Sequence, residues 1–244
     1  GLCGAAVAWK FIQVLYENMG ISVERSFEMI AHVAFATVGD VMDLTGENRT
    51  LVKLGLQAVH ETDNPGLCAL ISQNKLEKGQ IRSWHFGFVL GPCINAGGRL
   101  DTARRSLQLL MEPSLEKASQ LAKELVELND RRKNLTLQGL EDAKHLIEEQ
   151  GLCNDRVLVV YLPQCHESLA GIIAGRIREQ YHKPVFVLTN AEDGGVKGSG
   201  RSIEAYSMYE EMTKCKDLMT KFGGHPMAAG LSMDKENVET FRRD

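Results

Sequence analysis

The chain has 244 residues, of which 43% are hydrophobic and 25% are charged, a composition typical of a globular protein with a sizeable core. Its formal net charge of -4 excludes a general basic coat for nucleic acid. Any nucleic-acid contact must therefore come from local placement of Arg and Lys. No apolar run approaches the roughly 20 residues that a membrane-spanning helix needs, so we expect no membrane contact.

The first 112 residues are predicted to be mostly helical. A helix is expected over residues 1–20, and residues 36–41 read as a short buried strand or the end of a helix. A turn at 45–48 precedes a helix that the Pro-Gly pair at 65–66 breaks. Segment 91–103, GPCINAGGRLDTA, has the small and polar composition of a loop.

The clearest predicted element is a long helix within residues 113–150. Ser114 is a plausible N-cap, apolar residues recur at three- and four-residue steps, and Gly151 fits a C′ glycine. At 1.5 Å per residue such a helix is roughly 54 Å long, which suits a connector between two lobes. The apolar pattern weakens near Asn129, so a break in the helix there is the alternative.

After Gly151 the pattern changes to strand–helix–strand, which predicts an α/β fold. Strands over 157–161 and 185–189 flank a helix over 167–181, as in a parallel βαβ unit. The remaining pattern predicts a strand within 194–202, one or two short helices in 206–220, a strand over 228–233 and a helix over 237–243. Because both ends of the chain lie inside helical patterns, we expect a fragment cut at both ends.

The six cysteines lie far apart and form no CxxC pair. This spacing argues against a zinc ribbon or a thioredoxin-type motif. We interpret them as reduced thiols, which predicts a cytoplasmic location.

Two Gly-rich loops, 194–202 and 222–230, are candidates for gripping a phosphate-bearing ligand such as the end of a nucleic acid strand. Glycine lets the backbone approach a ligand and turn its N–H groups toward an anion. Arg201 supplies a fork suited to phosphate oxygens, and His225 is the titratable side chain of the second loop. Neither loop matches the P-loop or the dinucleotide fingerprint, and two ordinary turns are the alternative.

Three further side chains are candidates for nucleic-acid contact. Asn95 and Arg99 lie in the small-residue segment 91–103, where a capping turn with a surface Arg is the alternative. His166 follows the first strand of the βαβ unit, where open α/β sheets place ligands. A capping or surface His is the alternative there.

Asp40, at the end of an apolar stretch, is a candidate ligand for a divalent cation, with Asp43 as the neighbouring alternative. An N-cap or a paired surface carboxylate is the more common role for a lone Asp. Two-metal phosphoester chemistry needs several carboxylate or His ligands around ions roughly 4 Å apart, and the sequence has no dense Asp/His cluster.

Five segments together resemble the RecJ-type single-stranded-DNA-specific exonucleases, which are DHH phosphoesterases. They occur in the order and approximate spacing of that family: ATVGDVMDLTGENRTLVKLGL, GPCINAGGRLDTA, CHESLAGIIAGRI, GGVKGSGRS and FGGHPMAAGL. The resemblance runs over nearly the whole chain. It implies an α/β protein with the C-terminal part of a DHH catalytic domain over 1–112, a connector helix over 113–150, and a smaller DHH-associated domain over 151–244.

The resemblance also implies a function and a site. The function would be 5′ to 3′ hydrolysis of single-stranded DNA with Mn²⁺ or Mg²⁺ in recombination and repair, with a single-strand-binding protein as a candidate partner. Asp40 would be a catalytic metal ligand, and Arg99 would lie near the 5′ phosphate. The remaining implied contacts with phosphate or nucleotide are Ser199, Gly200, Arg201, Ser202, Gly223, Gly224 and His225.

The departures from the family concern the metal site. Its first three metal motifs, including the Asp-His-His triplet, would precede Gly1, and its nucleic-acid-binding OB-fold would follow Asp244. We therefore expect the isolated chain to have no nuclease activity. Two alternatives stay open: another DHH phosphoesterase acting on short oligonucleotides, cyclic dinucleotides or pyrophosphate, and a non-catalytic scaffold that kept the fold and lost the metals.

Overall fold

The computed structural model of the chain describes residues 1–192 and 194–243. They divide into two compact units, Gly1–Asp130 and Arg131–Asp244. Helix α8 (Leu115–Glu149) contributes residues to both units and is continuous, so it has no break near Asn129. The side chain of Asn129 is only 3% exposed and donates to Cys93 Sγ at 3.6 Å, which explains why a polar residue interrupts the apolar pattern.

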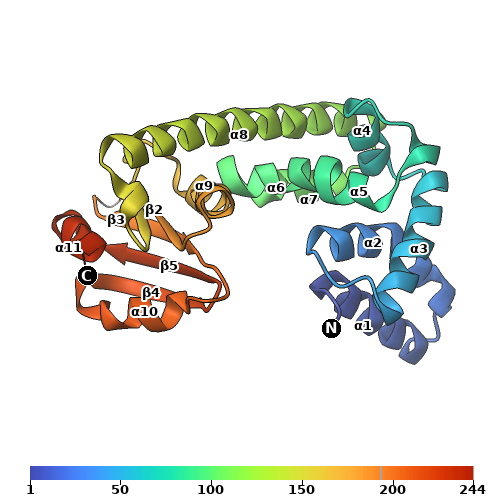
Figure 1. Ribbon diagram of the computed structural model, residues 1–244. Helices are drawn as coiled ribbons and strands as arrows, with labels where there is room; N and C mark the ends of the chain where they lie inside the picture. The colour runs from blue at the N-terminus through green and yellow to red at the C-terminus, as the bar shows by residue number, and fades with distance from the viewer. Residues whose placement is uncertain (193, 244) are drawn as a thin grey trace. The chain divides into compact units, whose positions relative to one another are not determined.

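The first unit is helical, as predicted (Figure 1). Its core combines Phe35, Leu70 and Phe86 with residues from the first half of α8. The elements before α8 are α1 (Gly4–Asn18), η1 (Val23–Met29), α2 (Ile30–Gly39), α3 (Gly46–Glu61), α4 (Pro65–Gln73), η2 (Lys78–Gln80), α5 (Ser83–His85), the π-helical turn η3 (Phe86–Leu90), α6 (Gly91–Leu100) and α7 (Ala103–Met111).

The loop expected over 91–103 is wrong, because the structure places α6 and the start of α7 there. Gly97 of this segment serves helix packing. A Cβ on Gly97 would lie 3.0 Å from Ser106 Oγ and 3.3 Å from Leu125 Cδ2, closer than side chains normally pack. Tertiary packing therefore overrides the low helix propensity of this segment.

The second unit contains a five-stranded sheet in the order β1-β2-β3-β5-β4 (Figure 1). β1 and β2 pair in parallel around α9, which confirms the βαβ unit, and the other pairs are antiparallel. Gly151, at φ +67°, follows α8 in the left-handed conformation that favours glycine. The strands are β1 (Leu158–Tyr161), β2 (Val185–Asn190), β3 (Val196–Arg201), β4 (Met219–His225) and β5 (Ala228–Met233). The helices are η4 (Leu152–Asn154), α9 (Glu167–Tyr181), α10 (Met208–Lys214), η5 (Lys216–Leu218), η6 (Lys235–Asn237) and α11 (Val238–Arg243).

The sheet has a separate core on each face. On one face, Ile173 of α9 packs with Val185 and Val187 of β2 and with the second half of α8. On the other face, Phe186 and Leu188 pack with residues of α10 and α11.

The strands predicted within 194–202 and over 228–233 are confirmed as β3 and β5, whereas residues 222–225, interpreted as part of a Gly-rich loop, belong to β4. Alternation along β3 turns Gly198 and Gly200 toward the buried core. A Cβ on Gly198 would lie 3.1 Å from Leu231 Cδ1, and one on Gly200 would lie 2.7 Å from Phe186 Cε1. These glycines make room for large side chains of the core.

Candidate nucleic-acid interface

One face of the sheet carries several of the predicted residues in register across its strands. Arg201 pairs with Ala228, which pairs with His225. The next row joins Ser199, Gly230 and Gly223, and the third joins Lys197, Ser232 and Lys221. Directly paired residues share a face of a sheet, so these side chains form one surface. We call these nine residues the open face.

The open face continues from the part of the sheet that α9 covers. Arg201, Ser199 and Lys197 pair on their other side with Val185, Val187 and Thr189 of β2, on the face where α9 packs. Farther from α9, Gly223, Gly230 and His225 are exposed. The centre of the open face thus consists of small residues, and its border carries Lys197, Lys221, Arg201 and His225. Such a surface can accommodate a sugar–phosphate backbone and neutralise the negative charge of its phosphates.

A cavity of about 240 Å³ lies between the first turn of α9 and strands β3 and β5. Its polar lining includes Ser168, Lys197, Ser199 and Ser232. Lys197 Nζ lies 2.7 Å from Glu167 Oε2, and both side chains are nearly half exposed. A helix N-terminus beside serine hydroxyls and a Lys favours an anion, while Glu167 competes for that Lys.

His166 is the N-cap of α9, as its alternative interpretation proposed. Its Nδ1 accepts the Ser168 N–H at 3.3 Å and lies 2.8 Å from Ser168 Oγ. The ring therefore organises the first turn of α9, next to the polar cavity. Contact between His166 and a nucleic acid stays a prediction.

Arg201 ends β3 and is partly buried against α9. Its Nη1 donates to the Gly200 carbonyl at 2.7 Å. The neighbouring Ser202 is fully buried, and its hydroxyl donates to the Tyr206 carbonyl at 2.6 Å. Ser202 thus closes the turn after β3, whereas Ser199 and Arg201 lie on the open face.

The residues of the predicted glycine–histidine motif have two different roles in the β4–β5 hairpin. A Cβ on Gly223 would meet nothing within 4 Å, whereas one on Gly224 would lie 2.7 Å from the backbone of Ala229. His225 Nδ1 accepts the Met227 N–H at 3.2 Å and so braces the turn. Gly223 and His225 lie on the open face, while Gly224 permits close strand packing.

In the first unit, Asn95 and Arg99 lie one turn apart on an exposed side of α6. Asp40 is the exposed C-cap residue that follows α2. The turn beyond it is a Schellman motif, in which Met42 N–H donates to Thr37 O at 3.2 Å and Val41 N–H donates to Val38 O at 3.1 Å. Val41 has φ +54°, a conformation that strains a β-branched residue next to the candidate ligand.

Within residues 1–192 and 194–243, no group of three or more His, Cys, Asp or Glu side chains is placed to hold a metal ion. Asp40 offers one exposed carboxylate, and Mn²⁺ or Mg²⁺ needs several oxygen ligands. The described residues alone therefore do not fit a metal ion, and Asp40 stays a predicted ligand.

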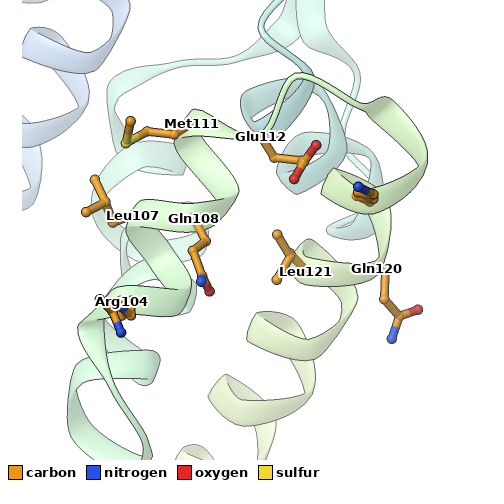
Figure 2. A pocket seen from close by; sticks show the side chains of 8 residues that line it. Arg104, Leu107, Gln108, Met111, Glu112, Gln120 and Leu121 are labelled. Carbon is orange, nitrogen blue, oxygen red and sulfur yellow. The ribbon is translucent and has the colours of Figure 1, made fainter.

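A second cavity, of about 630 Å³, lies between α7 and the first turns of α8. Figure 2 shows Leu107, Met111 and Leu121 along it, with Arg104 and Gln108 on the α7 side. Arg105 fixes α7 through ion pairs to Asp101 and to Glu124. None of the predicted site residues lines this cavity.

Sequence reasoning missed Lys197, Lys221 and Ser168. The signal was available in part, because alternation along β3 relates Lys197 to Ser199 and Arg201. The pairing of Lys197 with Ser232 depends on strand register, which the sequence does not give. Among the described helices, none is long and apolar enough to cross a membrane.

Comparisons with known proteins place this geometry in a family context. Residues 154–244 match the DHHA1 domain. The single-stranded-DNA-specific exonuclease RecJ of Dickeya dadantii is 35% identical over 99% of this chain, and RecJ of Bacillus subtilis is 33% identical over 99%. The chain spans 45% of the Dickeya protein and 30% of the Bacillus protein.

Solved structures agree with these sequence matches. A crystal structure of RecJ from Thermus thermophilus in complex with Mn²⁺ superposes with a TM-score of 0.86 at 32% identity, over 98% of this chain and 35% of that one. A crystal structure of exonuclease RecJ bound to manganese gives a TM-score of 0.86 at 31% identity, over 99% and 59% of the two chains. The matches confirm the resemblance and the mixed α/β class.

Proposed function

Because this chain contains a DHHA1 domain and is a homologue of the RecJ exonucleases over nearly its whole length, we propose that it binds the 5′ end of single-stranded DNA for a 5′ to 3′ exonuclease. The observation that carries the proposal is the open face, where Arg201, His225, Ser199 and Gly223 lie in adjoining rows. In the whole protein this activity would serve recombination and repair.

Each group on the open face has a part in holding a strand end. The Arg201 guanidinium donates two parallel hydrogen bonds to the terminal phosphate. Ser199 adds a short donor, and the missing side chains at Gly223 and Gly230 let the strand approach the sheet. Lys197 and Lys221 neutralise further phosphates, which attracts the strand without reading its sequence.

The division of the chain follows the same proposal. We assign residues 1–112 to the end of a DHH catalytic domain, 113–150 to the connector, and 151–244 to the nucleic-acid-binding domain. Mn²⁺ or Mg²⁺ would activate water in the whole protein, in keeping with the metal-bound RecJ crystal structures. A cytoplasmic location and a single-strand-binding protein as partner belong to the same proposal.

The 244-residue chain alone should not hydrolyse DNA. Its described residues offer Asp40 as one candidate ligand and no larger donor group. The test is release of nucleotides from single-stranded DNA by the purified chain with Mn²⁺, and such release would contradict this part of the proposal.

Binding of the strand end can be tested with Arg201→Ala. Charge-assisted hydrogen bonds contribute about 1.5–3 kcal/mol each, so loss of the two should lower the affinity for a 5′-phosphorylated oligo-dT by at least about 100-fold. Affinity for the 5′-hydroxyl strand should fall much less. Arg176→Ala, which removes an exposed Arg of α9, is the matched control and should change both affinities little. Equal loss for the two strands in the Arg201 variant would refute the terminal-phosphate role.

A further inference from the structure

Helix α9 presents two glycines, one turn apart, toward β3. A Cβ on Gly171 would lie 2.7 Å from Arg201 Nη2, 3.3 Å from Cζ and 3.5 Å from Nη1. The guanidinium of Arg201 therefore lies directly against the α-carbon of Gly171. A Cβ on Gly175 would lie 4.0 Å from Arg201 Cγ, which is an ordinary contact.

The guanidinium is also held from its own strand. Arg201 Nη1 donates to the Gly200 carbonyl at 2.7 Å, while Nη2 makes the closest approach to Gly171. A free Arg side chain samples many rotamers, so confinement between a strand carbonyl and a helix backbone removes much of the entropic cost of ordering it on a ligand.

We propose that Gly171 is a positioning residue for Arg201: by leaving the space beside its α-carbon empty, it fixes the guanidinium in the orientation that receives the strand's terminal phosphate. This inference rests on the proposed function of Arg201. It gives Gly171 of α9 a role in ligand binding in addition to helix packing.

Replacing Gly171 with Ala separates this role from a structural one. Within 4 Å, the three nearest atoms to the Cβ would be Arg201 Nη2, Cζ and Nη1, the far end of a flexible side chain. Alanine is also a better helix former than glycine. The variant should therefore keep its fold and its thermal stability while the guanidinium moves.

The experiment compares Gly171→Ala, Gly175→Ala, Arg201→Ala and the Gly171/Arg201 double variant of the 244-residue chain. Fluorescence anisotropy measures binding of 3′-labelled oligo-dT that carries either a 5′ phosphate or a 5′ hydroxyl. Gly171→Ala should weaken binding of the phosphorylated strand about 5- to 10-fold and leave the hydroxyl strand within about twofold. Gly175→Ala should bind both like the parent, and the double variant should bind like Arg201→Ala.

The outcomes distinguish this inference from the function it rests on. If Arg201→Ala loses the preference for the 5′ phosphate and Gly171→Ala keeps it, the positioning role is overturned and the proposed function stands. Equal loss for both strands in Arg201→Ala overturns the proposed function itself. Further loss when Gly171→Ala is added to Arg201→Ala, or a clear fall in the melting temperature of Gly171→Ala, also overturns the positioning role.

Discussion

Gly200 and Gly223 lie on neighbouring parts of the sheet, and we expect the same substitution to have opposite consequences at the two positions. A Cβ on Gly200 would overlap Met208 Sδ and lie 2.7 Å and 2.9 Å from two ring carbons of Phe186. Carbon atoms normally pack at about 3.5–4.0 Å, so the neighbours must move by roughly 1 Å. Met208 can change rotamer, but the Phe186 ring is 3% exposed and packs edge-on against Phe241 at 5.2 Å.

Overpacking of this kind costs about 1–3 kcal/mol, and an Ala in a strand returns about 0.5–1 kcal/mol. We therefore expect Gly200→Ala to lower the free energy of unfolding by about 1–2 kcal/mol. For a domain of about 100 residues this corresponds to a fall in melting temperature of about 4–16 °C. Gly223→Ala, which meets nothing within 4 Å, should leave the melting temperature unchanged or slightly raised.

Differential scanning calorimetry suits this measurement, because both tryptophans, Trp9 and Trp84, lie in the first unit and their fluorescence would not report the sheet. Binding of oligo-dT gives the complementary readout. Gly223→Ala should weaken oligo-dT binding, because the added methyl group occupies space on the open face where the strand approaches. The folded Gly200→Ala variant should bind oligo-dT like the parent. A Gly200 variant as stable as the parent, or equal destabilisation by both substitutions, would refute the division between packing and ligand-facing glycines.

Three further predictions concern single side chains. Val41→Gly should raise the free energy of unfolding by about 0.5–1 kcal/mol in urea titrations, because glycine relieves the strained φ of +54°; a loss of stability would contradict this. Burial, aided by the Asp142 carboxylate, raises the pKa of the Cys165 thiol to about 11. Iodoacetamide at pH 8 should therefore label the exposed Cys153 before Cys165. Equal labelling rates in mass spectrometry would contradict this prediction. Burial lowers the pKa of His32, so the unfolded chain binds more protons and stability should fall as pH drops below about 6.5. Urea unfolding followed by Trp fluorescence measures the free energy of unfolding at each pH. In His32→Gln this free energy should depend less on pH, and an unchanged pH dependence would exclude His32 as its cause.

Sequence periodicity predicted the elements whose residues face a core directly. The leucines of α8 and the apolar residues of β1, α9 and β2 follow the expected steps, and the βαβ unit is confirmed. Periodicity failed where glycine makes room for a neighbour's side chain. Gly97 accommodates Ser106 and Leu125, and nothing in the local sequence identifies those distant partners.

The same limit applied to the candidate site. Arg201 and Ser199 stood out by residue type, but their pairing with Ala228 and Gly230 depends on strand register. Register also decides that Gly200 faces the core while Gly223 lies on the open face. A Gly-rich sequence alone does not distinguish these two positions. Lys221 became a candidate only once β4 was placed beside β5.

Strand β4 is one of the two edge strands of the sheet, and none of its residues is buried. Elements with little buried apolar surface open locally at low free energy, so the amide hydrogens of β4 should exchange with solvent sooner than those of β2. A ligand that binds only the closed hairpin would slow this exchange in proportion to its concentration and affinity. Hydrogen exchange at Gly223 and His225 would then measure occupancy of the surface, even where the bound and free structures are the same.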